Sequence, residues 1–447
     1  MFAIHASKLQ LQHALARLRR SSFVKNVLVV MSGTAVAQVI GFALTPVISR
    51  LFSPSDFGVF GSFDSVSSII AAGATLEYTQ AIMLPKEKED AIHLFFVSCL
   101  CTFAISFLCL IICLLAPTSL NSVMKTGGVW ALALLVLATL VNGLNNSCQA
   151  WCVRVKAFKH TSASQVIRSL SSNGTQVGFG YLKGGAAGLI ISSVLADMVA
   201  SLNLVRVLIP DLLAFRPRIR WDRMKGLARE YLDFPMYAAS QNVINALSSG
   251  LPVLLLTYFY GIVVAGAYAF GIRILKVPMN FVLRALRQVL FQKAGETQHQ
   301  GGSLGPLYVK TTLGLFALAF FPSLLLFLWA PQIFTWIFGS QWYTAGEFAR
   351  SLILWMMFAF CNLPAVLFAR LIRIQRTVFL YDLVLLAVRV LALVLGGLYL
   401  SALHAIVLFS LVGAAMNAIL ILLVGYAVMK REGQANLAHI RDCLIQG

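Results

Sequence analysis

Apolar stretches of about 20 residues recur along this chain from its first tenth to its end, separated by short polar or basic breaks. Helices of about 20 residues cross the roughly 30 Å hydrocarbon core of a bilayer, and in lipid a helix satisfies its own backbone hydrogen bonds. Only 11% of the 447 residues are charged, against about 25% in a soluble domain. The chain is therefore expected to be an all-α integral membrane protein.

About twelve transmembrane helices follow from these stretches, with ends defined to within a few residues. The predicted spans cover residues 27–49, 57–82, 91–115, 128–149, 164–181, 186–208, 234–256, 261–283, 308–330, 347–369, 377–398 and 402–428.

A strongly basic loop, Arg206–Asp233, divides these spans into two equal halves. Faint internal similarity supports two lobes, because Pro46 and Gly58 in the first half correspond to Pro252 and Gly266 in the second, although Pro and Gly are common in membrane helices generally. The pattern predicts two lobes of about six helices related by a pseudo-two-fold axis, an arrangement typical of transporters that work by alternating access. The predicted segments are an amphipathic amino-terminal segment 1–26, an amino-terminal lobe 27–208, a basic linker 209–233, a carboxy-terminal lobe 234–428 and a tail 429–447.

The 35 Lys and Arg residues are distributed unequally between the two faces of the membrane. Loops on one face contain only Arg50, Lys125, Lys183 and Arg350, the spans contain Arg273, Lys276 and Arg389, and we assign the others to the opposite face. The positive-inside rule places the basic face and both termini in the cytoplasm of a multi-pass inner-membrane protein. This scatter over short loops also explains the net charge of +19 without a nucleic-acid partner.

Several short motifs, distributed over both halves of the chain, are informative through their order and spacing. Gly33, Gln38 and Pro46 lead to Arg50–Gly58 (RLFSPSDFG), Tyr78 precedes Pro85, Lys86 and Ala91, Arg273–Pro278 is followed by Gln288 and Val289, and Phe338–Gly346 (FGSQWYTAG) precedes Leu352 and Trp355. Together they resemble the flippase family that moves lipid-linked O-antigen and other polysaccharide repeat units, within the multidrug/oligosaccharidyl-lipid/polysaccharide exporter superfamily. The chain departs from the family pattern around Tyr78, where Glu77 and Thr79 replace the usual Arg and Glu, so no role is transferred to charges at those positions.

The resemblance implies a transporter and not an enzyme. A polyprenyl-pyrophosphate carrying a sugar repeat unit would move from the cytoplasmic to the periplasmic leaflet, in contact with membrane lipids and beside a polysaccharide polymerase and chain-length machinery. No cofactor is expected beyond coupling to H⁺ or Na⁺. Two alternatives remain open: a cation-coupled multidrug exporter of the same superfamily, and a membrane-embedded glycosyltransferase or polymerase, for which Asp56 and Glu347 are the only acids we place outside.

Ionisable side chains inside spans are candidates for function, because each costs roughly 3 kcal/mol to insert. Arg273 lies midway along the eighth span and Lys276 follows one turn later on the same face, so together they suit a pyrophosphate. In the alternative interpretation Lys276 extends to the cytoplasmic headgroups and Arg273 pairs with an acid such as Asp64 or Asp197. Arg50, at the outer mouth, either anchors the helix or assists substrate release.

Amide side chains occur on the first helix of each predicted lobe. They are Gln38, Gln241, Asn242 and Asn245. Amides bind sugar hydroxyls well because they offer donors and acceptors, and they also form hydrogen bonds between membrane helices. Trp336, Trp342 and Tyr343 are expected to form an interfacial aromatic belt.

The acids inside the predicted spans are candidates for ion coupling. A carboxylate buried in a low-dielectric environment binds a proton readily, so Asp64, Glu77 and Asp197 are hypothesised coupling residues, with structural pairing as the alternative. Asp382 and Arg389 lie seven residues apart on one helical face and are expected to pair with each other. The eight cysteines lack the spacing of a zinc site, and no metal site is predicted.

Overall fold

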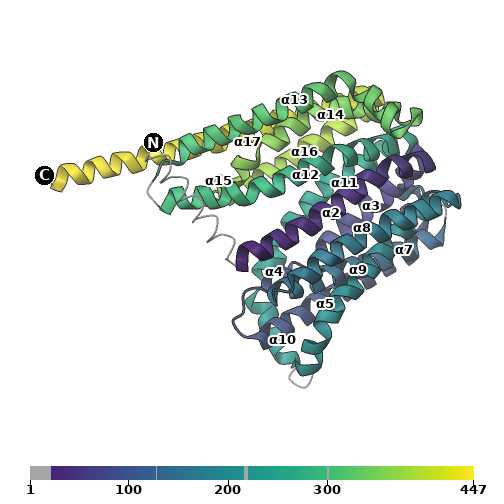
Figure 1. Cartoon of the computed structure of the whole chain (residues 1–447), viewed down its shortest axis with the longest axis horizontal. Coiled ribbons are helices and arrows are strands. Elements are labelled where there is room, and N and C mark those ends of the chain that lie inside the picture. The colour runs from purple at the N-terminus through teal and green to yellow at the C-terminus, as the bar shows by residue number, and fades with distance from the viewer. Residues whose placement is uncertain (1–21, 127, 216–219, 300–301, 447) are drawn as a thin grey trace, which may run out of the picture. The chain divides into compact units, whose positions relative to one another are not determined.

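The computed structural model describes residues 22–126, 128–215, 220–299 and 302–446, and within these ranges all regular secondary structure is helical (Figure 1). The predicted segment 1–26 therefore lies mostly outside the described residues, as do residues 216–219 of the basic linker and Gly447 at the end of the tail. Eleven helices in the described part of the chain are long and apolar enough to cross a membrane. The predicted all-α membrane fold is confirmed.

The fifth predicted span, 164–181, is the one that does not coincide with an apolar helix. It forms α8 (Phe158–Tyr181), which has 24 residues, and Ser, Thr, Asn and Gln side chains recur in it from Thr161 to Gln176. Each of the other predicted spans coincides with one of the eleven apolar helices. The polar character of α8 means that part of its surface needs polar neighbours or water, because a helix of this composition is not stable with every face in lipid.

The second predicted span, 57–82, ends earlier than expected. Helix α3 (Pro54–Ala74) stops before Leu76 and Glu77, whose φ angles are 47° and 58°. This left-handed backbone is unfavourable for residues other than glycine and cannot continue a right-handed helix. Glu77 therefore lies outside the membrane-spanning helices, in the turn that leads to α4 (Tyr78–Ala81).

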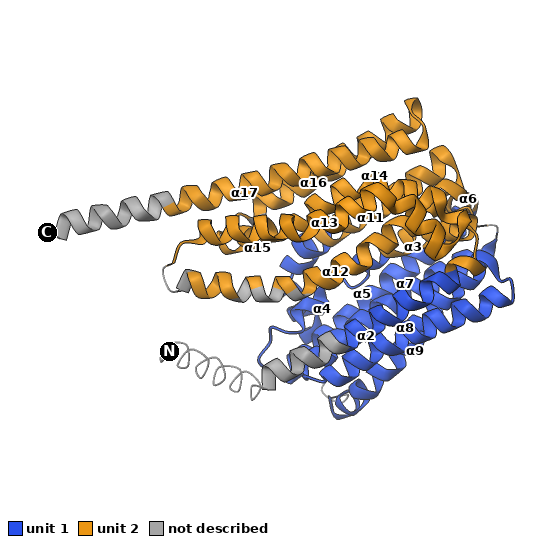
Figure 2. Ribbon diagram, turned by 45° about the horizontal axis from the view of Figure 1, so that its top comes forward, with its two compact units in different colours: residues 1–48, 70–117, 128–240 blue, residues 49–69, 118–127, 241–447 orange. Residues whose placement is uncertain are grey.

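The helices form two compact units, which Figure 2 shows in different colours. Unit 1 comprises Met1–Ile48, Ile70–Pro117 and Gly128–Ser240, and unit 2 comprises Ser49–Ile69, Thr118–Gly127 and Gln241–Gly447. The end of α2 (Ser22–Leu51) and most of α3 thus belong to unit 2, whereas the sequence pattern assigned them to the amino-terminal lobe 27–208. The predicted segment boundaries remain a prediction.

Unit 1 is a helical bundle with its own apolar core. Besides α4, α8 and most of α2 it contains α5 (Lys88–Leu115), α7 (Val129–Arg154), α9 (Gly185–Phe215), α10 (Trp221–Glu230) and the π-helical turn η2 (Phe234–Ala239). Helix α9 packs against α7 and α8, and α5 packs against α7 and α10. Ile92, Trp151 and Leu204 are fully buried where these helices meet.

The basic linker is largely helical in its described part and is fixed to unit 1. Helix α10 buries Met224 and Leu227. The Tyr78 hydroxyl donates to the Ala228 carbonyl at 2.9 Å, and Arg223 donates to both carboxylate oxygens of Asp90 at 2.8 and 2.6 Å. These bonds to Asp90 raise the pKa of the Arg223 guanidinium. The linker therefore contains a docked helix and is not a loose tether.

Unit 2 contains the remaining described helices. Besides most of α3, they are α6 (Pro117–Met124), α11 (Ser240–Tyr260), α12 (Ile262–His299), α13 (Leu304–Phe338), the 3₁₀ turn η3 (Ser340–Trp342), α14 (Tyr343–Cys361), α15 (Leu363–Leu371), α16 (Gln375–Tyr399) and α17 (Ala402–Gln446). Helix α14 packs against α12, α13 and α17, and α16 packs against α17. The rings of Tyr308 and Phe368 meet in its core with centroids 5.3 Å apart.

The two glycines of the internal similarity lie at one close helix crossing in unit 2. A Cβ atom on Gly58 would lie 2.0 Å from the carbonyl oxygen of Ile262, and one on Gly266 would lie 1.8 Å from the carbonyl oxygen of Pro54. Backbone therefore contacts backbone where α3 crosses the start of α12. Membrane helices use small residues for this kind of approach.

Replacing Gly266 by alanine is expected to lower the stability of unit 2 by about 1–3 kcal/mol, since the new methyl group cannot fit without moving one helix. The thermal unfolding midpoint of the purified protein measures this loss. Gly314→Ala in α13 is the matched control, because no atom lies within 4 Å of its added Cβ. Equal unfolding midpoints for the two variants would show that α3 and α12 can move apart at this crossing without loss of stability.

One residue of the predicted aromatic belt has a different role. Trp336 is 81% exposed and Tyr343 is 50% exposed, but Trp342 is fully buried. Its ring stacks on Phe270 with centroids 3.9 Å apart, and its indole N–H donates to the Ser49 carbonyl at 2.8 Å. The prediction is therefore wrong for Trp342, which anchors the end of α2 by bonding a carbonyl of its last turn.

Candidate functional site

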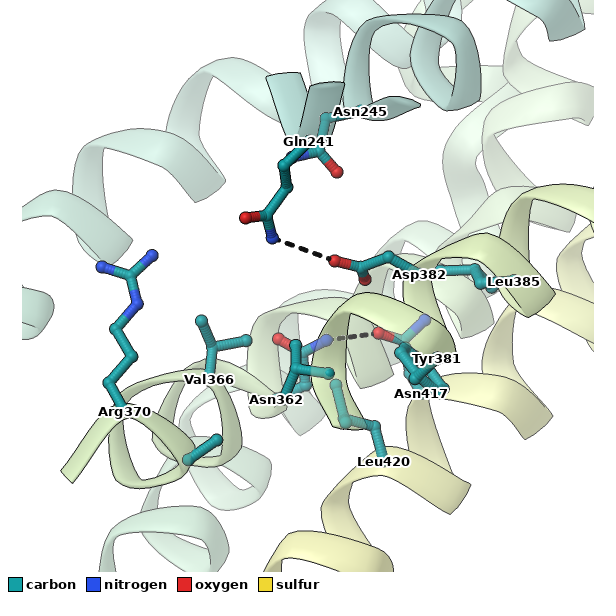
Figure 3. A pocket seen from close by; sticks show the side chains of 12 residues that line it. Gln241, Asn245, Asn362, Val366, Arg370, Tyr381, Asp382, Leu385, Asn417 and Leu420 are labelled. Atoms are coloured by element: carbon teal, nitrogen blue, oxygen red, sulfur yellow. Dashed lines mark hydrogen bonds between the residues drawn. The ribbon is translucent and has the colours of Figure 1, made fainter. Parts of the chain in front are cut away.

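Unit 2 contains a cavity of about 270 Å³ between α11, α15, α16 and α17 (Figure 3). The lining residues are Gln241, Asn245, Asn362, Val366, Ala369, Arg370, Val378, Tyr381, Asp382, Leu385, Asn417 and Leu420. Two of the predicted sugar-binding amides, Gln241 and Asn245, are among them. The third amide predicted on α11, Asn242, is half-buried and is not part of this lining.

Amide groups meet a single carboxylate in this cavity. Figure 3 shows the Gln241 side chain directed at Asp382, and its Nε2 donates to the carboxylate Oδ2 at 3.5 Å. On the adjacent wall the Asn362 Nδ2 donates to the Asn417 Oδ1, and the Asn417 Nδ2 donates to the Gly413 carbonyl at 2.6 Å. Neutral amides supply donors and acceptors together, which is the chemistry that sugar hydroxyls require.

Asn362 and Asn417 were not among the candidates from the sequence. Both are amides inside apolar predicted spans, 347–369 and 402–428, so the signal that selected Gln241 was also available for them. Their spacing in the sequence gives no indication that they share a wall with α11, because that proximity arises only when α15 and α17 pack together.

The amide predicted in the first half lies in unit 1, on a polar seam between α2 and α8. Gln38 is half-buried, and its Oε1 atom is buried with no hydrogen-bond partner among the described residues. Close by, Thr34 bonds to Gln165 and the Ser169 hydroxyl donates to the Ala37 carbonyl at 2.6 Å. This seam contains the interhelical hydrogen bonds that were the alternative interpretation for such amides.

The two predicted phosphate ligands lie one turn apart on α12, and both are half-buried. Arg273 and Lys276 fall in the part of α12, Ile262–Arg284, that is apolar enough to span a membrane. Lys276 is within electrostatic range of Arg389 on α16. Unit 2 therefore concentrates positive charge on α12 and α16, and the phosphate-binding role of Arg273 and Lys276 remains a prediction.

Asp382 and Arg389 do not form the expected ion pair. The Asp382 carboxylate bonds to Gln241. The Arg389 guanidinium carbon lies 4.2 Å from the ring centroids of both Trp355 and Phe409, and one terminal nitrogen is 3.5 Å from the Ser248 hydroxyl. Seven residues correspond to about 10 Å along a helix. Arg389 therefore makes cation–π contacts with rings of two other helices, α14 and α17, and does not pair with the acid on its own helix.

Asp197 belongs to a half-buried ion pair in unit 1. The Arg168 Nε contacts one carboxylate oxygen, and a terminal guanidinium nitrogen donates to the other at 3.2 Å. The Asp197 side chain is 8% exposed and that of Arg168 is 55% exposed. A bidentate contact of this kind fixes the carboxylate strongly. The coupling role predicted for Asp197 therefore has to be considered together with Arg168.

Arg168 is the charged residue that the sequence interpretation missed. It lies inside the predicted span 164–181 and was assigned to the cytoplasmic face with the neighbouring loop. The rule that selected Arg273, an ionisable side chain within a span, applies to it equally. The structure places it eleven residues into α8, on the polar helix that pairs with α9.

The other two predicted coupling acids have different surroundings. Asp64 lies on α3 and is exposed. Glu77 lies in the turn after α3, where it accepts a hydrogen bond from the Gln80 amide at 2.5 Å. An acid outside the spanning helices does not have the low-dielectric surroundings on which the prediction depended. The coupling roles of both remain predictions.

Arg50 lies in the last turn of α2 and is exposed. A terminal guanidinium nitrogen is 3.5 Å from the Ile337 carbonyl, near the end of α13. A cation at a helix carboxy terminus is favourable for the helix dipole. This geometry agrees with the anchoring interpretation, and a role in substrate release remains a prediction.

The described architecture occurs in solved membrane transporters. A lipid II flippase, MurJ, in an inward closed conformation has a TM-score of 0.69 and 11% identity, covering 89% of this chain and 87% of its own. An inward-facing multidrug resistance MATE family transporter of the MOP superfamily has a TM-score of 0.64 and 16% identity, covering 90% and 96%. A MOP superfamily transporter from Pyrococcus furiosus has a TM-score of 0.61 and 15% identity, covering 91% and 96%. At these identities the likeness establishes the fold.

Sequence comparison identifies the family. No curated protein matches the chain. The sequence profile of the family described as "Polysaccharide biosynthesis protein" matches residues 47–347, which include the end of α2, all of unit 1 that follows it, and unit 2 into α14. This match confirms the resemblance inferred from the sequence motifs. The chain therefore belongs to the polysaccharide biosynthesis protein family and has the two-lobed helical fold of the MOP superfamily transporters.

Proposed function

We propose that this protein is a flippase that moves a polyprenyl-pyrophosphate-linked, O-antigen-like repeat unit from the cytoplasmic to the periplasmic leaflet of the inner membrane. The observation that carries the proposal is the amide-lined cavity of unit 2 in a chain of the polysaccharide biosynthesis family. Four amides supply the donors and acceptors that sugar hydroxyls require, and Arg370 lines the cavity together with the Asp382 carboxylate, so the lining has no excess of negative charge to attract a cationic drug.

In this proposal the amides hold the sugars and the cations of α12 hold the pyrophosphate. Gln241 and Asn245 bind hydroxyl groups in the cavity, with Asp382 as an acceptor. Arg273 and Lys276 supply the positive charge that a pyrophosphate requires. Rocking of one lobe against the other then presents the repeat unit to the opposite leaflet.

The driving force and the partners are further parts of the proposal. Entry of H⁺ or Na⁺ would drive the cycle, with Asp64, Glu77 and Asp197 as candidate coupling residues. The product is a lipid-linked oligosaccharide on the periplasmic leaflet, which is the form that a polysaccharide polymerase and its chain-length machinery would take up. The cytoplasmic location of both termini is expected from the positive-inside rule.

Deletion of the gene tests the proposal against its alternatives. A flippase deletion removes surface polysaccharide, leaves tolerance to cationic drugs unchanged and accumulates the lipid-linked repeat unit in the cytoplasmic leaflet. Loss of drug tolerance with normal polysaccharide would instead indicate a multidrug exporter. Sugar transfer by the purified protein without another enzyme would indicate a glycosyltransferase or polymerase.

Removing the cavity amides is expected to weaken transport in proportion to the hydrogen bonds lost. Gln241→Ala combined with Asn245→Ala should lower polysaccharide output about tenfold, since each bond to a sugar contributes about 0.5–1.5 kcal/mol. Complementation of the deletion strain, normalised to the amount of inserted protein, measures the loss. Asn203→Ala is the control, because its amide bonds to the His160 carbonyl on α8 and is not part of the cavity lining. Equal output from the two variants would exclude the cavity as the sugar site.

A further inference from the structure

A strongly basic turn joins α15 to α16 beside the amide-lined cavity of unit 2. Arg370, Arg373 and Arg376 follow one another at intervals of three residues, and residues 362–381 contain no Asp or Glu. All three arginines are exposed. These three residues are called the basic turn below, and their positive charge has no acid beside it in the sequence.

The basic turn lies at the membrane surface. One span, Ser340–Leu371, ends there, and the next, Arg376–Tyr399, begins there. The diphosphate of a polyprenyl lipid lies at this depth before transport, because a multiply charged group does not enter the hydrocarbon. Arg273 lies inside the apolar part of α12, Ile262–Arg284. The basic turn can therefore contact a substrate that has not yet moved, whereas Arg273 meets it only after it enters the span.

Hydrogen bonds fix the backbone of the basic turn. The Ile374 N–H donates at 2.9 Å and the Arg373 N–H at 3.3 Å to carbonyls of the last turn of α15, which are the two bonds of a Schellman motif. Arg373 has φ 58°, a left-handed conformation in which glycine is the favoured residue. From α17, the Arg431 Nη1 donates to the Ile372 carbonyl at 2.8 Å. The turn is thus an ordered element that presents exposed guanidinium groups.

Arg370 connects the basic turn to the cavity. It is the one Lys or Arg among the lining residues, and Figure 3 shows it at the edge of the labelled side chains. In a sugar diphosphate the first sugar is bonded directly to a phosphate, so a site for the diphosphate has to adjoin a site for that sugar. Arg273 and Lys276 are not part of the cavity lining. The basic turn has the position that this covalent connection requires.

We propose that the basic turn is a loading site, which binds the diphosphate of the substrate at the membrane surface while the first sugar enters the cavity. This inference rests on the proposed function and adds to it the residues that receive the substrate. Guanidinium groups bind phosphate oxygens in pairs, and several of them match the charge of a diphosphate. Arg273 and Lys276 then take over the diphosphate as the lobes rock.

The experiment measures binding of farnesyl diphosphate to the full-length purified protein in phosphatidylcholine nanodiscs, from the rise of the unfolding midpoint with ligand concentration. Arg370→Gln and Arg373→Gly should each weaken binding about tenfold or more, because each removes a charge-assisted hydrogen bond. Arg373→Lys should weaken it about fivefold, since lysine lacks the planar fork. A charge that served only to orient the helices in the membrane would be replaced fully by lysine.

Lys156→Gly is the matched control for Arg373→Gly. Lys156 has φ 59° in the same kind of turn after α7, where the Ala157 N–H donates to the Cys152 carbonyl at 2.8 Å. Glycine adopts this conformation without strain, so neither substitution should lower the unfolding midpoint of the ligand-free protein. Only Arg373→Gly should lose affinity for farnesyl diphosphate, and misfolding cannot account for a loss of affinity at an unchanged midpoint.

Two results would overturn the proposal. One is the absence of a midpoint shift in the wild type, or wild-type affinity in Arg370→Gln and Arg373→Gly. The other comes from replacing part of the phosphatidylcholine by phosphatidylglycerol: an equal stabilisation that also depends on Arg373 would make the basic turn a general site for lipid phosphates. The assay measures no transport, so its result is independent of the deletion test of the proposed function.

Discussion

Replacing Arg273 by alanine is expected to lower polysaccharide export to below about a tenth of the wild-type level, while the protein remains inserted. Arg273 is a half-buried cation in the membrane-spanning part of α12. A charge-assisted bond to a phosphate contributes about 1.5–3 kcal/mol, and a loss of that size corresponds to roughly a ten- to hundredfold lower rate. Complementation of a deletion strain, with membrane-fraction immunoblots for the amount of protein, measures the effect.

Arg284→Ala is the matched control, because Arg284 is an exposed arginine at the end of the same span. Its removal should leave export within about twofold of wild type, as for other exposed positions. Arg273→Lys should recover only part of the activity, since an ammonium keeps the charge and loses the planar fork that binds two phosphate oxygens. Wild-type export from Arg273→Ala, with normal insertion, would exclude Arg273 as a substrate ligand.

The fold was largely predictable because lipid imposes one pattern. A span must be apolar over about 20 residues, and eleven of the predicted spans meet that criterion in the structure. Helix α8 does not meet this criterion, because its Ser, Thr, Asn and Gln side chains bond to neighbouring helices. Its composition alone therefore does not distinguish a membrane helix from a surface helix. The end of α3 depends on the backbone at Leu76 and Glu77, which hydropathy does not report.

The candidate site was predictable only in part, because a site depends on contacts between helices. Gln241 and Asn245 could be selected from the sequence because both are amides on one predicted helix, and they do line the cavity. Asn362 and Asn417 come from helices distant in sequence, so no local pattern connects them to α11. The supposed pair of Asp382 and Arg389 fails for the same reason: Trp355 and Phe409 belong to α14 and α17, and only packing brings them to Arg389.

Removing Arg168 is expected to destabilise unit 1 by about 1–3 kcal/mol, because Arg168→Met leaves the buried carboxylate of Asp197 without this arginine, whose own exposure to solvent weakens the pair. Asp197→Asn should lower the stability of unit 1 by less than Arg168→Met does. The guanidinium left behind is on a side chain that is 55% exposed, whereas the side chain of Asp197 is only 8% exposed, so the arginine can be solvated and the carboxylate cannot. Thermal unfolding of the purified variants measures this asymmetry, and polysaccharide output measures its effect on transport.

The double variant Arg168→Met with Asp197→Asn separates stability from function. Removing both charges leaves an uncharged contact with no unpaired carboxylate, so the free energy of unfolding should return to within about 1 kcal/mol of wild type. If export returns with stability, the pair serves only to join α8 and α9. If stability returns and export does not, the charges of Arg168 and Asp197 take part in transport itself. Equal destabilisation by the two single variants would contradict the argument from burial, because that argument requires the loss of the exposed partner to be the more costly.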